Sequence, residues 1–110
     1  MMRPALSVAA AGLLRSLLAR AGVDRDRILL TEFRSTDWQS LTFVGERHEI
    51  GLRLAGSDAA RIVERLTDRL EEVEWNIPGQ IVADIGLDGP AVESADGSII
   101  LSIEALTIVE

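Results

Sequence analysis

The densest cluster of polar side chains is Glu46-Arg47-His48-Glu49, which holds the only histidine of the 110-residue chain. Alternate side chains of a β-strand point to opposite faces, so Glu46 and His48 share one face. A carboxylate beside an imidazole can orient it and raise its basicity, as a general base requires. A surface ladder of polar side chains, or a histidine satisfied at the edge of the sheet, is the simpler interpretation, because one ionisable pair on a strand is common. We therefore predict no catalytic residue.

A second hypothesis keeps this cluster as a small-molecule site, or a modest enzyme, in a cleft near His48. Arg47 or Arg53 would hold an anionic group there. Trp38, expected at a turn, would line the pocket or instead plug one end of the fold. The ligand-binding side chains of this alternative are Glu46, Arg47, His48, Arg53 and Trp38.

The composition excludes several other kinds of site. The chain has no cysteine, so it has no disulfide, thiolate nucleophile or cysteine-bound zinc. His48-Glu49 begins a zinc-protease motif, but Leu52 stands where the second histidine is required. The carboxylates of the last third do not have calcium-loop spacing, and no serine lies in a Gly-x-Ser-x-Gly motif. We expect no metal and no cofactor.

The chain is acidic, with a net charge of −7, and its charge is unevenly spread. Residues 1–27 hold five arginines against two aspartates, whereas residues 70–110 hold nine carboxylates and no basic residue. Binding to a phosphate backbone needs a basic face, so we expect no nucleic-acid partner. The basic start could lie near the acidic end of its own chain, or meet that of a second copy.

The first 21 residues could form a folded helix or a processed targeting segment. Pro4 fits the first turn of a helix, and Gly22 fits its C-cap. Five apolar residues recur on one helical face, namely Leu6, Ala10, Leu13, Leu17 and Ala21. We predict a folded helix, no membrane span because the apolar run is too short, and a cytoplasmic location.

Two strands are expected next, at residues 27–36 and 41–55, joined by a turn at 37–40. The apolar phase of the second strand changes near Gly45, which predicts a bulge there. Ser57 is expected to cap the second helix, whose apolar stripe is the clearest in the sequence.

A hairpin should complete the chain, with strands at residues 80–87 and 98–109 and a tight turn at Asp96-Gly97. Centred on that turn, the hairpin would pair Ile85 with Ile108, unless a bulge near Pro90 shifts the register.

The predicted fold is therefore a single α+β domain over residues 1–110, with the order α-β-β-α-β-β. It would be a two-layer sandwich of a four-stranded, mainly antiparallel sheet with both helices on one face. If the last strand lies beside the strand at 41–55, the arrangement is a circularly permuted ferredoxin-like sandwich. A simple antiparallel meander is the alternative.

The final strand carries the main indication of function, because it is apolar on both faces and such strands are normally covered on both. A helix on the second face would be one way to cover it. We predict instead a non-catalytic module that self-associates as a dimer, or binds another protein, through the open sheet face. A regulatory domain that docks through its acidic C-terminal hairpin is a third hypothesis. The predicted interface residues are Ile100, Leu106, Ile108, Leu41 and Phe43.

Overall fold

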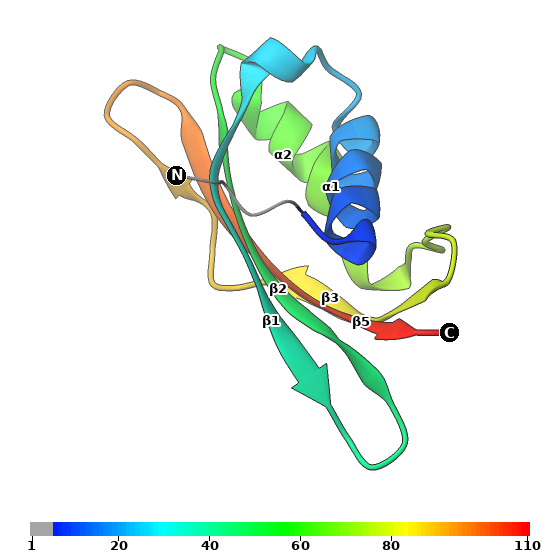
Figure 1. Cartoon of the computed structure of the whole chain (residues 1–110). Coiled ribbons are helices and arrows are strands. Elements are labelled where there is room, and N and C mark those ends of the chain that lie inside the picture. The colour runs from blue at the N-terminus through cyan, green and yellow to red at the C-terminus, as the bar shows by residue number, and fades with distance from the viewer. Residues whose placement is uncertain (1–5) are drawn as a thin grey trace, which may run out of the picture.

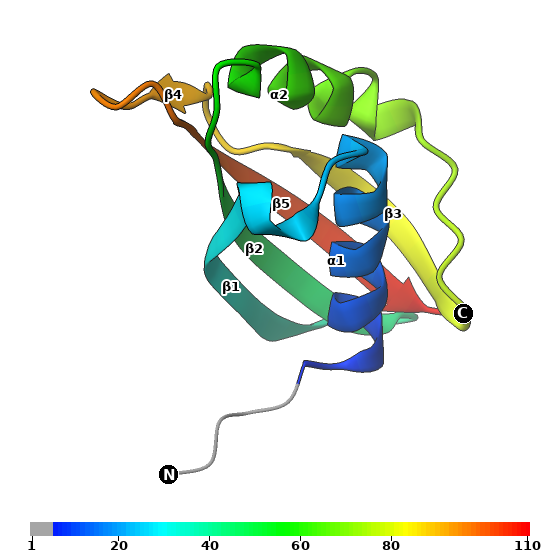
Figure 2. The same cartoon turned by 90° about the horizontal axis from the view of Figure 1, so that it is seen from above.

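The computed structural model describes residues 6–110 and confirms the predicted α+β class. Five strands form an antiparallel sheet, and both α-helices pack on the same face of it (Figures 1 and 2). The elements are α1 (Val8–Ala21), the 3-10 helix η1 (Arg25–Arg27), β1 (Ile28–Gln39), β2 (Val44–Leu54), α2 (Ala59–Thr67), the 3-10 helix η2 (Leu70–Glu72), β3 (Gln80–Leu87), β4 (Val92–Glu93) and β5 (Ile99–Val109).

The strand order is β1-β2-β5-β3, and β4 pairs with the beginning of β5. The last strand therefore lies beside β2, which is the order that the permuted ferredoxin-like arrangement requires. The sequence predicted four strands. The fifth arises because the chain leaves the sheet after Leu87, passes Pro90, and rejoins β5 with the two residues of β4.

Ser7 is the N-cap of helix α1, and its hydroxyl accepts a hydrogen bond from Ala10 N at 3.0 Å; Gly22, with a φ of 70°, is the C-cap. The helix interpretation is thus confirmed for residues 8–21, whereas the part of it that concerns Pro4 lies outside the described residues. The buried face of α1 contains the predicted apolar residues except Leu6, which is exposed. Together with α2, this face closes the core over the middle of the sheet.

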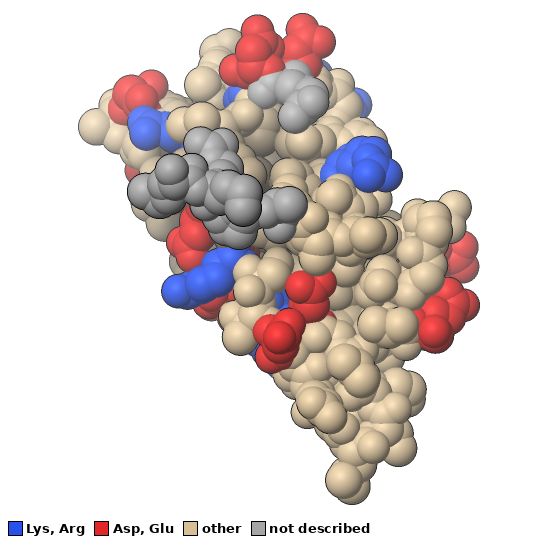
Figure 3. Space-filling model, in the orientation of Figure 1, with Lys and Arg blue, Asp and Glu red and all other residues tan. Residues whose placement is uncertain are grey.

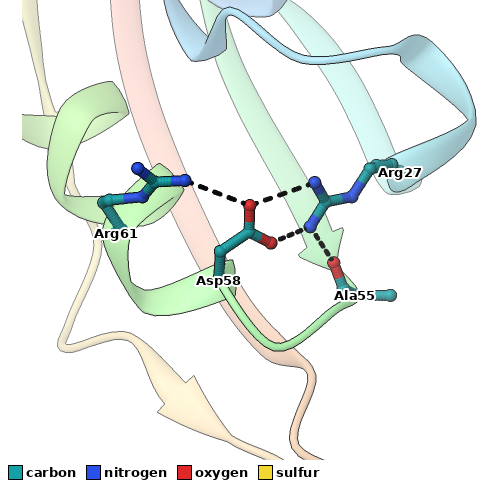
Figure 4. Close-up of polar contacts among 4 residues, drawn as sticks. All are labelled: Arg27, Ala55, Asp58 and Arg61. Atoms are coloured by element: carbon teal, nitrogen blue, oxygen red, sulfur yellow. Dashed lines mark hydrogen bonds and ion pairs between the residues drawn. The ribbon is translucent and has the colours of Figure 1, made fainter.

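Helix α2 has Asp58 at its N-cap rather than Ser57, and the Asp58 carboxylate makes no capping bond. It accepts hydrogen bonds from Arg27 and Arg61 instead, while Arg27 also donates to the Ala55 carbonyl at 2.9 Å (Figure 4). The hydrogen bond from Arg27 lowers the pKa of Asp58 to about 2. This ion cluster joins the beginning of β1 to the beginning of α2.

The β1–β2 hairpin turns at residues 40–43, three residues later than predicted, and projects beyond the helix layer (Figure 1). Its bulge lies between Leu30 and Glu32, so the prediction of a bulge at Gly45 is wrong. Gly45 serves another purpose, because a Cβ atom there would lie 1.9 Å from the backbone oxygen of Thr107. The glycine lets β2 and β5 approach closely at this point.

The register of the last hairpin also differs from the prediction. Ile85 pairs with Ala105 rather than with Ile108, and the β3–β5 ladder shifts between Val82 and Asp84. The loop at Asp96-Gly97 is wider than a two-residue turn, since the Ser94 and Ser98 backbones bond across it. Both irregularities move β3 along β5 relative to an ideal hairpin.

Candidate functional site

His48 lies on β2, inside the sheet and on the face covered by the helices, and has no exposed surface, so the prediction of a surface or edge position is wrong. Its Nδ1 atom is 2.7 Å from the Ser35 hydroxyl on β1, and its Nε2 atom is 2.9 Å from the Thr107 hydroxyl on β5. Its ring and that of Phe33 are in a T-shaped arrangement, with centroids 6.1 Å apart. One imidazole therefore links three neighbouring strands.

Burial lowers the pKa of His48, and the negative charge of Glu46 opposes that shift without cancelling it. The neutral imidazole has one donor and one acceptor nitrogen, and a hydroxyl can serve as either partner. Ser35 and Thr107 can thus satisfy both ring nitrogens of the neutral form. Protonation would place a charge in a site without a carboxylate in hydrogen-bond contact.

Glu46 lies on the same face as His48, as predicted, but its carboxylate accepts a hydrogen bond from Ser7 at 2.6 Å. It therefore holds the first turn of α1 against β2 instead of orienting the imidazole. Because His48 is inaccessible and Glu46 is engaged elsewhere, the geometry favours a structural role for this pair and gives the ligand-site hypothesis no support.

The two arginines of that hypothesis lie on the opposite face of the sheet. Arg53 donates to Ser98 at 3.0 Å and to Asp96 at 2.8 Å, so it holds the loop before β5. Arg47 lies opposite Leu106 in the ladder, is exposed, and has no ion-pair partner among residues 6–110. The five predicted ligand residues are thus divided between two faces.

The open face, the sheet surface turned away from α1 and α2, has an apolar row across four strands. Trp38, Gly45, Ile108 and Ile81 are aligned by the register from β1 to β3. Trp38 lies within β1 rather than at a turn, and its glycine neighbour leaves room for the indole beside it. Leu106 lies two residues before Ile108 on β5 and points to the same face. Trp38, Leu106 and Ile108 are half-buried, and Ile81 is 45% exposed.

The apolar surface continues to the hairpin end. Phe43 and Val44 are 50% and 58% exposed, and Leu41 is fully exposed. This projecting end has no charged side chain in Figure 3. We define the open-face patch as Trp38, Ile81, Leu106 and Ile108, which point to this face, together with the exposed Phe43 in the adjoining hairpin turn. Ile100 lies on the same face but at its far end, beyond Ser102 and Glu104.

The middle of the open face is charged. Arg34 binds Glu49 at 2.5–2.6 Å and lies 3.8 Å from Glu32, all on exposed surface. Glu49 faces Glu104 directly across the β2–β5 ladder. Glu32, Glu49, Asp88 and Glu104 line a shallow hollow, yet within residues 6–110 no three carboxylates or imidazoles are grouped as metal ligands would be.

The sequence predicted Leu106, Ile108 and Phe43 for an interface but did not name Ile81, and it placed Trp38 in a turn. The sequence contains a signal for the position of Trp38. If the first strand continues past residue 36, the alternation of side chains places Trp38 on the same face of the strand as Arg34.

No helix in the described part of the chain is long and apolar enough to cross a bilayer. Comparison with protein-family models, with curated proteins and with solved structures found no match.

Proposed function

We propose that this chain is a non-catalytic protein-interaction module, and that the open-face patch is the surface that binds its protein partner. One observation carries the proposal. Both helices lie on the same face of the sheet, while Leu106 and Ile108 of β5 point to the other face, where no helix in the described residues covers them. Contiguous apolar surface of this kind marks interaction sites.

The composition of the open face fits a protein partner. An aromatic and aliphatic centre would provide the anchoring contacts, and Trp38 belongs to the residue type that most often dominates binding energy. The charged strip with Arg34, Glu49 and Glu104 borders this centre and would act as a polar rim. Arg47 beside Leu106 adds a cation that could pair with a carboxylate of the partner.

Site-specific photocrosslinking in the native host tests the proposal. A benzoylphenylalanine replacing Phe43 should give a discrete protein adduct, whereas the same residue replacing Glu64 on the exposed side of α2 should not. Leu106→Glu should abolish the Phe43 adduct while circular dichroism stays unchanged. Equal adducts from both positions, or none from Phe43, would refute the proposal.

A cytoplasmic location is a further part of this proposal. Fluorescence microscopy of a C-terminal fusion in the native host would check it, and exclusive recovery of the protein in the medium would contradict it.

A further inference from the structure

We propose that two copies of this chain pair antiparallel along β1, which joins their sheets edge to edge and brings their α1 helices together. β1 is the outermost strand on its side and, at 12 residues, the longest in the sheet. The described residues place no strand against its outer edge. A free edge presents N–H and C=O groups that pair readily with another strand.

The charges of β1 select one register for this pairing. In a two-fold antiparallel strand pair, two residues that face each other point to the same face of the sheet. The two-fold axis therefore passes midway between one residue and the same residue of the other copy. An axis at Phe33 sets Glu32 of each copy opposite Arg34 of the other. An axis at Glu32 or at Arg34 would set two like charges against each other. An axis at Phe33 therefore gives two Glu32–Arg34 ion pairs between the copies. The Glu32 and Arg34 side chains are 57% and 64% exposed, so these ion pairs determine the specificity of the register more than the affinity of the dimer.

The flank of α1 nearest β1 provides the apolar part of the contact. Leu14 and Leu18 line a hollow of about 360 Å³ between α1 and β1, together with Leu30, which is 40% exposed. A second hollow of about 500 Å³ runs along the same flank and includes Leu6, which is 47% exposed. Arg15 is the one charged side chain that lines this second hollow, and the other lining residues are apolar.

The other flank of α1 is already covered within the chain. A Cβ atom on Gly12 would lie 2.7 Å from Ile77, so the segment before β3 packs tightly there. The exposed apolar flank and the free edge thus lie on the same side of the molecule. Phe33 points to the helix-covered face of β1 and packs on the core from its rim, so it would meet its own copy beneath the two helices.

A second copy is favoured over an unrelated strand because the Glu32–Arg34 pattern is complementary to itself. This pairing leaves the open-face patch accessible, since it uses the outer backbone edge of β1, whereas the patch, including Trp38 of β1, consists of side chains on the face of the sheet. The inference is therefore independent of the proposed function, and a failure of either one leaves the other standing.

Charge reversal tests the register. Light scattering coupled to size exclusion should give twice the mass of the chain for the wild type at micromolar concentration. Glu32→Arg should face Arg34 of its copy, and Arg34→Glu should face Glu32, so each variant alone should have the mass of one chain. An equimolar mixture of the two variants should recover the double mass, because each arginine pair then meets a glutamate pair.

Glu93→Arg, an exposed charge reversal in β4, is the matched control and should keep the double mass. Leu14→Glu should give single mass by placing a charge in the helix contact, with circular dichroism confirming its fold. A monomeric wild type, dimeric single variants, or a mixture that stays monomeric would each overturn the proposal.

Discussion

Thr107 on β5 holds the Nε2 atom of His48 on β2 at 2.9 Å, although the ladder pairs Thr107 with Glu46 and His48 with Ala105. The imidazole thus reaches diagonally across the ladder, and both partners are fully buried. Such a bond fixes how β2 and β5 are aligned, since a slipped register would bury an unpaired nitrogen.

Thr107→Val should lower the free energy of unfolding by about 1–3 kcal/mol, because it leaves a buried ring nitrogen without a partner. Ser35→Ala should cost less, because Ser35 is exposed and water can replace its hydroxyl. Urea denaturation followed by circular dichroism measures both. Thr36→Val, on the exposed open face, is the control and should stay within about 0.5 kcal/mol of wild type. Equal losses for Thr107→Val and Thr36→Val would contradict the structural role of the bond.

Acid should destabilise the protein through His48. The pKa of His48 is lowered in the folded protein, so the unfolded chain binds a proton at a pH at which the folded chain does not. Stability should therefore fall as the pH drops below the ordinary histidine pKa of about 6.5, until the lowered folded pKa is reached. The measurement is the urea midpoint as a function of pH. His48 is the only histidine, so His48→Gln should remove this pH-dependent component. An unchanged slope in that variant would assign the effect to other groups.

Gly45→Ala should destabilise the fold by more than about 2 kcal/mol, because overpacking against backbone cannot be relieved by a side-chain rotation. The new methyl group would meet the Thr107 carbonyl and the Ile108 Cα atom, which lies 2.9 Å away. Gly86→Ala in β3 is the matched control, since the nearest atom there is a Glu71 carboxylate oxygen at 3.4 Å. Thermal unfolding of both variants provides the comparison, and similar melting temperatures would contradict the close approach.

The Asp58 carboxyl should titrate near its folded pKa of about 2, which a carbon-detected NMR titration would resolve. Arg27→Met should raise this pKa towards the ordinary value of about 3.9, since the bond from Arg27 is the main cause of the shift. Arg61→Met should raise it less, because Arg61 is the more exposed partner, with its nitrogen 3.4 Å from the carboxylate. The wild-type interaction stabilises the fold above about pH 3.9 and is lost as the pH falls towards 2. A larger shift for Arg61→Met would show that the assignment is reversed.

Much of the fold follows from local sequence signals. The strand at 80–87 was predicted with its observed bounds, and the apolar faces of β5 separated as the alternation required. Leu101, Ile103 and Ala105 are buried under the helices, whereas Leu106 and Ile108 point the other way.

The remaining differences arise from contacts that join distant parts of the chain. Gly45 suggested a bulge locally, but its role depends on Thr107, 62 residues away along the chain. Asp58, and not Ser57, is the N-cap residue of α2, and its carboxylate binds Arg27. The single histidine is hydrogen-bonded to hydroxyls from two other strands. Pairing partners of this kind have no signature at short range.

The acidic last third of the chain forms the side of the sheet opposite β1. Asp84 lies in β3, Glu93 lies in β4 and Asp88 lies between the two strands, and residues 70–110 contain no basic side chain. Two such borders would repel each other, and Pro90 interrupts the run of backbone donors between the two strands. Addition of a further strand is therefore disfavoured on this side, which limits growth into fibres whether or not β1 is paired.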